Sequence, residues 1–361
     1  MSRRILFIAM HRPGRSPGQR FRFEQYLGYL EQNGWTCDVS HLISEADDRV
    51  LYRPGGFLRK GGIFVRSVLT RLADVVRARR YDVVFVYREA LMVNTDLIEQ
   101  MLARSSAQLV YDFDDAIWIP AISTGNEALG WLRGASKVDR IIRRADLVLA
   151  GNEYLADHAR ALNSNVHVMP TTVDTDLYAP PPPRPEGRVR IGWSGSPSTA
   201  PYFDALAPAL VRVQERFGDR VEVRMFGDGK YASEQLGIRG VAWTRESEPV
   251  EVARMDVGVM PLPDDPWARG KCGFKALLYM AFGVPAIVSP VGVNTDIIRD
   301  GENGLLARTD DEWVDALTAL IEDPARRHRL GMAGRETVVA RYSVQATRER
   351  YLSLLDTLAS A

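Results

Sequence analysis

The sequence predicts an α/β protein with two doubly wound domains, each a parallel sheet covered by helices. Short apolar runs alternate with segments of helical periodicity along all 361 residues, which is the pattern of βαβ units. A proline run at 178–187 divides the chain into halves of similar length. A fresh series of strand and helix patterns begins on each side of that run, so we expect one sheet in each half.

The expected strands are apolar runs of four to six residues, typical of strands buried on both faces. They lie at 5–10, 82–87, 108–111 and 147–150 in the first half, and at 189–193, 221–226, 257–260 and 286–289 in the second. Amphipathic segments separate them and are expected to be helical. They include 23–33, 63–80 and 313–320.

The clearest domain seam is Tyr178-Ala-Pro-Pro-Pro-Pro-Arg-Pro-Glu-Gly187. Consecutive prolines cannot continue a helix or a central strand, and they favour an extended spacer. We therefore expect a first domain at 1–168, a linker at 169–187 and a second domain at 188–342. A last helix, at 343–361, is expected to pack back on the first domain.

Composition excludes several classes of protein. Hydrophobic residues make up 46% and charged residues 25%, which is ordinary for a globular chain. Lys+Arg and Asp+Glu both number 46, so no bulk positive charge indicates nucleic-acid binding. Two distant cysteines, Cys37 and Cys272, form no disulfide framework and predict a reducing cytoplasm. The longest apolar stretch, 276–288, is broken by Gly283 and Pro285 and is too short to span a bilayer.

The loop after the first strand is basic and contains glycine. Gly14 and Gly18 do not make the G-x-G-x-x-G fingerprint of dinucleotide-binding proteins, which argues against an NAD enzyme. Arg20 and Arg22 stand where the first helix is expected to begin. Cations at a helix N-terminus are unfavourable unless an anion binds nearby, so we expect an anion there. A solvated basic loop is the alternative.

The same charge pattern recurs at 270–285. Gly283 and Pro285 mark the end of a helix, and we expect Lys271 and Lys275 in its first turn. Two lysines beside a dipole of the same sign need an anion of more than one charge. A diphosphate would suit this position.

Three further loops follow expected strands of the second half and are rich in small residues. Small residues let backbone N–H groups approach an oxyanion closely. Ligands bind at the carboxyl ends of parallel strands, so we expect these loops to meet at one edge of the sheet. The loops contribute Ser194, Gly195 and Ser196; Gly227, Asp228 and Gly229; and Gly292, Val293 and Asn294.

In combination, these motifs resemble the donor-binding domain of the retaining family 4 glycosyltransferases, which have the GT-B fold. The resemblance implies two Rossmann-like domains facing a central cleft, and a role in glycan biosynthesis. Val168-Met-Pro-Thr-Thr-Val-Asp174 is similar to the family's interdomain crossover. The motifs are Met225-Phe-Gly-Asp-Gly229, Gly258-Val-Met-Pro-Leu262, Leu278-Tyr-Met-Ala-Phe-Gly-Val-Pro285, Pro290-Val-Gly292, Asp300-Gly-Glu-Asn-Gly-Leu-Leu306 and Met332-Ala-Gly-Arg-Glu336.

The chain departs from the family pattern in its donor helix. The family typically has two glutamates there, and Gly270 and Leu278 stand at those positions. The usual Arg/Lys pair after the first strand of this domain is replaced by Gly192-Trp-Ser-Gly195. The sequence therefore resembles a subgroup with a lysine-bearing donor helix, in which Lys271 and Lys275 neutralise the diphosphate.

The expected acceptor side contains Val110-Tyr-Asp-Phe-Asp-Asp-Ala-Ile-Trp118, which resembles a segment of the same subgroup. Asp112, Asp114 and Asp115 follow a strand there, and we interpret them as a polar cluster for acceptor hydroxyls. A D-x-D metal site belongs to a different fold, and a hard cation needs more oxygen ligands. The alternative is that these carboxylates cap a helix or pair with Arg88.

The resemblance implies transfer of a sugar from a nucleotide-diphosphate sugar to an acceptor hydroxyl, with retention and without metal or further cofactor. We expect no nucleic-acid partner. The alternatives are a non-catalytic nucleotide-sugar-binding protein and a sugar-nucleotide epimerase. The expected catalytic residues are Lys271, Lys275, Asp114 and Arg20; Trp243 joins the donor loops near the base; the acceptor residues are Gly18, Arg22, Asp112 and Asp115.

Residues 51–81 combine eight Lys/Arg and one acid with several large apolar side chains. A basic amphipathic face of that kind can lie on anionic lipid at the inner membrane face. The alternative is a helix that packs on the first sheet and carries a charged outer face.

Overall fold

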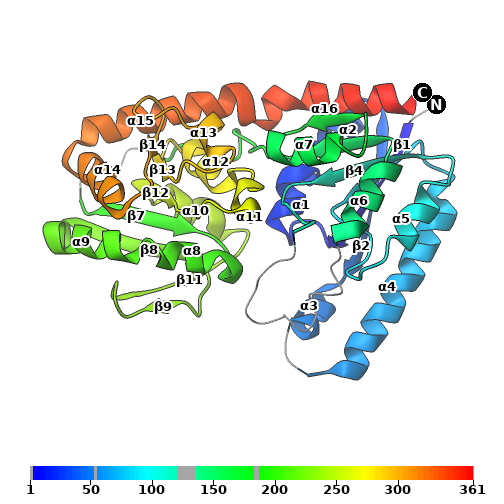
Figure 1. Cartoon of the computed structure of the whole chain (residues 1–361), viewed down its shortest axis with the longest axis horizontal. Coiled ribbons are helices and arrows are strands. Elements are labelled where there is room, and N and C mark those ends of the chain that lie inside the picture. Colours follow the sequence, from blue (N-terminus) through cyan, green and yellow to red (C-terminus); the bar gives the residue numbers. More distant parts are fainter. Residues whose placement is uncertain (1–2, 53–54, 120–134, 183–186, 361) are drawn as a thin grey trace. The chain divides into compact units, whose positions relative to one another are not determined.

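The computed structural model describes residues 3–52, 55–119, 135–182 and 187–360 (Figure 1). Parts of the proline run and of the basic segment, 183–186 and 53–54, lie outside the described residues. The chain divides into two compact units. The first comprises Met1–Thr171 and Arg348–Ala361, and the second comprises Thr172–Thr347.

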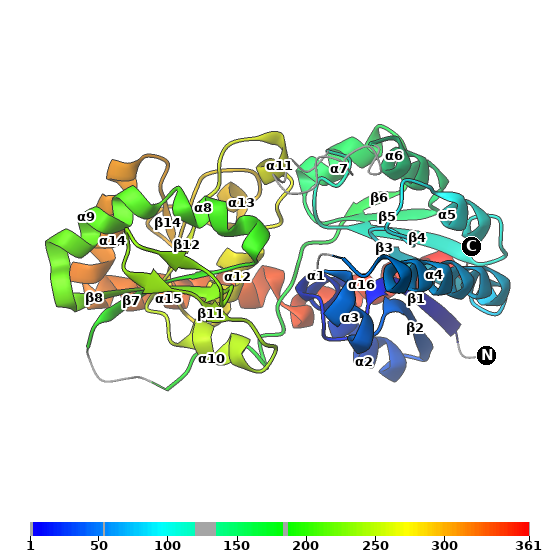
Figure 2. The ribbon, with the colours of Figure 1, turned by 90° about the horizontal axis from the view of Figure 1, so that it is seen from below.

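The first unit is built on a six-stranded sheet whose neighbouring strands are all parallel. Four of its strands are apolar runs that the sequence predicts, and helices cover both faces (Figure 2). The strand order changes direction between β1 and β3, so the sheet has a topological switch point there. Across the sheet the strands are β2 (Trp35–Ile43), β1 (Arg3–His11), β3 (Val83–Tyr87), β4 (Gln108–Phe113), β5 (Leu147–Ala150) and β6 (Val166–Val168).

The helices of the first unit pack around an aromatic core in which Phe7 stacks on Phe23 at 5.0 Å. The end of the chain belongs to this unit. Tyr351 stacks on Tyr26 at 4.3 Å, and Asp356 accepts a hydrogen bond from the Trp35 indole at 2.9 Å. The helices are α1 (Pro17–Arg22), η1 (Glu24–Tyr26), α2 (Leu27–Gln32), α3 (Glu45–Leu51), α4 (Phe57–Ala78), α5 (Leu97–Leu102), α6 (Ala135–Arg144), α7 (Glu153–Arg160) and the end of α16 (Val344–Ala359).

The second unit contains another six-stranded parallel sheet. Its order changes direction between β7 and β12, which places the switch point there. A short antiparallel pair, β9 (Ala232–Ser233) and β10 (Ile238–Arg239), follows β8. Across the sheet the strands are β11 (Val241–Ala242), β8 (Val221–Gly227), β7 (Val189–Ser194), β12 (Val257–Met260), β13 (Ala286–Val288) and β14 (Leu305–Leu306).

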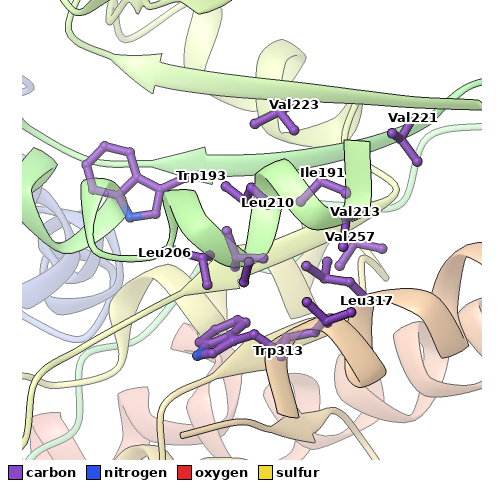
Figure 3. Close-up of a cluster of buried hydrophobic side chains, with 14 of the residues drawn as sticks. Ile191, Trp193, Leu206, Leu210, Val213, Val221, Val223, Val257, Trp313 and Leu317 are labelled. Carbon is purple, nitrogen blue, oxygen red and sulfur yellow. The ribbon is translucent and has the colours of Figure 1, made fainter. Parts of the chain in front are cut away.

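The core of the second unit lies between this sheet and helices α9 and α14 (Figure 3). Ile191 and Val257 from the sheet meet Leu210 and Leu317 from the helices in one apolar cluster. The helices are η3 (Pro197–Thr199), α8 (Ala200–Asp204), α9 (Ala207–Phe217), η4 (Gly218–Arg220), α10 (Ser247–Ala253), α11 (Pro266–Arg269), α12 (Phe274–Ala281), α13 (Asn294–Ile297), α14 (Asp310–Glu322), α15 (Pro324–Thr337) and η5 (Val338–Tyr342).

Local sequence signals explain several helix ends. Thr309 and Glu312 form a capping box at the start of α14. Gly283 has a φ of 68° directly after the last turn of α12, as predicted for a C-terminal cap. Pro208 lies in the first turn of α9, where a missing backbone N–H costs no intrahelical hydrogen bond.

The expectation that Arg20 and Arg22 begin a helix is wrong. Helix α1 begins at Pro17, so Arg20 and Arg22 lie in its last turn, where cations are favourable and need no anion. Helix α4 packs on the first unit and exposes Arg59 and Arg66, as the alternative of a packed helix predicts. Leu58, Leu69 and Val76 are exposed on it as well. In the described part of the chain, no helix combines the length and the apolar character needed to cross a bilayer.

Candidate functional site

The switch point of the second sheet gathers several of the expected donor residues. Strand β7 ends at Ser194, beside β8 and β12. The Gly195 amide donates to the Phe226 carbonyl at 2.9 Å, which joins the loop after β7 to the end of β8. Gly227 has a φ of 134°, and a Cβ there would lie 1.6 Å from the Gly195 carbonyl oxygen. Both loops therefore need glycine to approach each other this closely.

Helix α12 adds a cation to this edge. The Lys275 ammonium lies 5.4 Å from the centroid of the Trp193 ring, and Trp193 is buried at the end of β7. A cation over an indole face is stabilised by the ring quadrupole, and more so where water is excluded. A Cβ on Gly195 would lie 2.3 Å from the same ring. Lys275 and the loop at Gly195 thus both pack against Trp193.

A second contact from α12 fixes the end of β7. The buried Tyr279 hydroxyl accepts a hydrogen bond from the Ser194 amide at 2.8 Å and lies 3.4 Å from the Val259 carbonyl of β12. One side chain therefore bridges the two strands that flank the switch point. Nothing in the spacing of Tyr279 along the sequence indicated this bond.

The turn before α12 lies against the expected loop at 292–294. A Cβ on Gly292 would lie 2.6 Å from the Arg269 carbonyl oxygen, and one on Gly273 would lie 3.3 Å from the Val293 side chain. The Asn294 side-chain amide donates to the Ser289 carbonyl at 3.0 Å and is buried. This loop is therefore held close to the start of α12.

The two lysines occupy different positions. Helix α12 begins at Phe274 after Gly273, whose φ is 67°, so Lys275 lies in its first turn and Lys271 precedes the helix. The expectation of both lysines in the first turn is wrong for Lys271. Its ammonium lies 5.0 Å from the centroid of the Trp267 ring of α11.

The remaining expected donor residues lie along the loops after β7 and β8. The Ser196 hydroxyl contacts that of Ser198 at 2.8 Å at the exposed start of η3. The Asp228 side chain accepts from the Lys230 amide at 2.8 Å. A Cβ on Gly229 would meet Ala242 of β11 at 2.9 Å.

Trp243 is held by a carboxylate that the sequence analysis missed. Its indole N–H donates to Glu248 at 2.7 Å, and Tyr178 donates to the other carboxylate oxygen at 3.0 Å. Glu248 is buried in α10. Nothing in the sequence of α10, which contains both Glu248 and Glu251, singles out Glu248.

The switch point of the first sheet gathers part of the expected acceptor side. A Cβ on Gly18 would lie 2.2 Å from the Tyr87 hydroxyl and 3.4 Å from Asp114. Tyr87 donates to Asp114 at 2.9 Å. Burial raises the pKa of Tyr87 well above its ordinary value, so this hydroxyl keeps the proton that it donates.

Arg88 pairs with the two partly exposed carboxylates. Its Nε donates to Asp114 at 2.7 Å, and its Nη2 donates to Asp115. Its φ of 61° is the only positive value among the non-glycine residues that the structure describes. Such strain persists only where surrounding contacts impose it, and it is common at functional sites. The alternative that the sequence left open, pairing with Arg88, thus describes Asp114 and Asp115.

Asp112 and Arg22 lie in the interior of the first unit. Both side chains have zero exposure, and Arg22 Nε donates to Asp112 at 3.0 Å. Arg22 also donates to the Met169 carbonyl. Both side chains are therefore buried and paired with each other in the first unit, and their acceptor role stays a prediction. Arg20 is 8% exposed and lies over the Phe21 ring at 4.4 Å.

Aromatic residues near this edge were also missed. Trp118 stacks on His158 with ring centroids 3.9 Å apart, and Tyr154 lies 6.1 Å from Trp118. Among the described residues, no group of three or more His, Cys, Asp or Glu side chains is arranged to hold a metal ion.

The second unit matches a known family. Residues 188–323 match the sequence model described as "Glycosyl transferases group 1". They contain β7, both glycine loops and α12.

The chain is also similar to a protein named as a glycosyltransferase. The chain is 25% identical over 227 residues to the D-inositol 3-phosphate glycosyltransferase of Corynebacterium aurimucosum, which covers 54% of this chain and 53% of that protein. The chain thus matches about half the length of this relative.

The fold is that of solved GT-B proteins. Sucrose-phosphate synthase from Thermosynechococcus elongatus superposes with a TM-score of 0.74 at 18% identity, over 99% of both chains. HepE of Anabaena, solved with UDP and glucose, superposes with a TM-score of 0.70 at 16% identity, over 98% of this chain and all of that one. The two parallel-sheet, Rossmann-like domains of the prediction are confirmed.

Proposed function

We propose that this protein is a glycosyltransferase that moves a sugar from a nucleotide-diphosphate sugar to an acceptor hydroxyl, with retention of anomeric configuration. The observation that carries the proposal is the cluster at the second switch point, where Lys275, the Gly195 loop and the Gly227 turn share one edge. Ligands of open α/β sheets bind at such points. The D-inositol 3-phosphate glycosyltransferase relative and HepE with its UDP support a nucleotide donor.

Sugar transfer requires positive charge near the diphosphate leaving group. As the bond between sugar and diphosphate breaks, negative charge grows on the departing phosphate. Lys275 and the start of α12 both carry positive charge and lie at the same edge. Fixed donors aimed at developing charge supply large catalytic terms, about 2.7–4 kcal/mol for each donor in comparable sites. We assign this role to Lys275 and to the Gly195–Ser196 backbone, with Lys271 and the 292–294 loop beside them.

On the first unit, we propose that Asp114 and Asp115 receive the acceptor. Arg88 orients both carboxylates and balances their charge, and Tyr87 holds Asp114. Their side chains are 11% and 17% exposed, so each retains some access to solvent. In this arrangement the buried pair of Arg22 and Asp112 supports the edge of the first sheet that carries Asp114 and Asp115. The two free thiols, Cys37 and Cys272, support a reducing cytoplasm as the place of action.

Nucleotide binding is the first test. A thermal-shift panel of UDP, GDP, ADP and their common sugars should raise the unfolding temperature with one base; at a hundredfold over Kd, binding adds about 2.7 kcal/mol. Lys275→Ala should weaken that binding at least tenfold. Arg220→Ala is the matched control, because this exposed cation precedes β8 at the opposite edge of the sheet. Equal nucleotide affinity in wild type and Lys275→Ala would refute the assignment.

Product analysis separates the alternatives. A transferase releases nucleoside diphosphate only when an acceptor is added, whereas a nucleotide-sugar-binding protein releases none. An epimerase converts its substrate without any acceptor. The anomeric proton coupling of the first product, measured by NMR, distinguishes retention from inversion.

A further inference from the structure

The inward face of helix α4 is partly polar. It carries the buried polar residues Ser67, Arg71 and Asp74 beside the buried apolar residues Ile63 and Ala78. Arg71 donates to Asp74 at 2.7 Å and to the Ala90 carbonyl at 2.8 Å, and Ser40 donates to Asp74 at 2.6 Å. This network satisfies the buried polar groups within the unit. The helix is therefore held to the unit by hydrogen bonds as well as by apolar contacts, while other apolar residues of α4 face outward.

The outer face of α4 carries an apolar stripe. The stripe residues recur at spacings of seven, four, three and four, which places them on one side of a helix, opposite Arg71. Their exposure ranges from 39% to 94%. Figure 1 shows α4 along the outside of the first unit, with no other element of that unit beyond it. We call these residues the outer stripe: Leu58, Val65, Leu69, Leu72 and Val76.

The flank of the outer stripe is basic. Arg59 and Arg66 lie along one side of it, and Arg79 and Arg80 follow the helix end; all four are exposed. Arg66 also pairs with Asp47 of α3, so Arg59, Arg79 and Arg80 are the main cations of this flank. The one acid of α4, Asp74, is buried and paired with Arg71 and Arg77. The exposed surface of α4 thus combines apolar and positive groups without a carboxylate of its own.

We propose that the outer stripe docks on a membrane surface that contains anionic lipid. Apolar side chains of an interfacial helix enter the headgroup boundary while flanking arginines meet negative phosphates. Charge complementarity favours lipid over a second copy of this chain, because a helix pair would bring Arg59 and Arg66 of each copy together. The proposal does not depend on the chemistry of the sugar site.

Co-sedimentation of the whole protein with vesicles tests the proposal. Vesicles of phosphatidylglycerol and phosphatidylcholine should pellet the protein at low salt, and phosphatidylcholine alone should not. Leu69→Gln should raise the lipid concentration for half-maximal binding roughly tenfold, because it removes buried apolar area. Arg59→Gln should raise it roughly fivefold and reduce the salt dependence. Leu177→Gln is the matched control, since Leu177 is 66% exposed on the second unit, against 60% for Leu69.

Three results would overturn the proposal. The first is no binding to anionic vesicles at low salt, with the folded state confirmed by circular dichroism. The second is equal loss of binding in Leu69→Gln and Leu177→Gln. The third is a dimer in solution that Leu69→Gln dissociates, which would make the outer stripe an interface between two copies. Nucleotide binding measured in parallel keeps this outcome separate from that of the proposed transferase.

Discussion

The hydroxyl of Tyr279 accepts a hydrogen bond from the backbone nitrogen of Ser194, 2.8 Å away, and so ties the donor helix to the end of β7. The same helix places Lys275 over Trp193, the residue directly before Ser194. The position of the lysine and the shape of the glycine loop therefore depend on one another. A perturbation of either contact should be felt in nucleotide binding.

Tyr279→Phe should destabilise the second unit by about 1–3 kcal/mol, because it leaves a buried amide without its partner. Nucleotide affinity should fall with it, since the Gly195 loop loses its support. Urea unfolding and calorimetric titration with the identified nucleotide measure the two effects. Tyr351→Phe is the control, because the buried Tyr351 hydroxyl has no hydrogen-bond partner among the residues that the structure describes. Equal unfolding free energies for the two variants would contradict this account.

Asp112→Asn should destabilise the first unit by about 3–5 kcal/mol, because Arg22 would be left as a buried charge without its counter-ion. Asp115→Asn should lower the unfolding free energy less, since the ion pair of Asp115 with Arg88 is partly exposed and Asp114 remains beside Arg88. Urea unfolding of the two variants makes the comparison. The positioning role would be wrong if Asp112→Asn kept the stability of the wild type and lost only acceptor affinity.

The interior of the fold was predictable because central strands of parallel sheets are continuous apolar runs. Every run expected as a strand is one, from β1 to β13. Strand β2 was missed because an edge strand is half-exposed, so that apolar and polar residues are mixed along it. Strand β14 was missed because it has only two residues. The positions of residues along a helix were predicted less accurately than the strands. Ser16 and Pro17 mark the start of α1, and this signal would have placed Arg20 and Arg22 correctly at its end.

From the sequence, only the loops of the candidate site could be predicted. Glycine loops after strands locate the edge of a sheet, and Gly195 and Gly227 do meet there. The pair of Arg22 and Asp112 joins residues 90 positions apart, and no local spacing reports such a contact. The bond between Tyr279 and Ser194 is of the same kind.

Gly227→Ala should disrupt the donor edge. A methyl group there would overlap the Gly195 carbonyl, and the φ of 134° is unfavourable for any side chain. We expect a loss of at least tenfold in nucleotide affinity together with a lower unfolding temperature. Gly187→Ala is the matched control in the same unit, because a Cβ at Gly187 meets nothing within 4 Å. Full nucleotide affinity in Gly227→Ala would remove this loop from the site.

The stability of the first unit should depend on pH through His11. Burial, with the nearby Arg15, lowers the pKa of His11 below its ordinary value of 6.5. The unfolded chain therefore binds a proton more readily than the folded one as pH falls through 6.5, and stability drops. The drop ends once pH is below the folded pKa, where both states are protonated.

His11→Gln should remove this part of the loss of stability at low pH, whereas His328→Gln, on the second unit, should leave the loss unchanged. Urea unfolding of the wild type and both variants between pH 5 and 8 measures the difference, and parallel curves for His11→Gln and wild type would contradict the assignment.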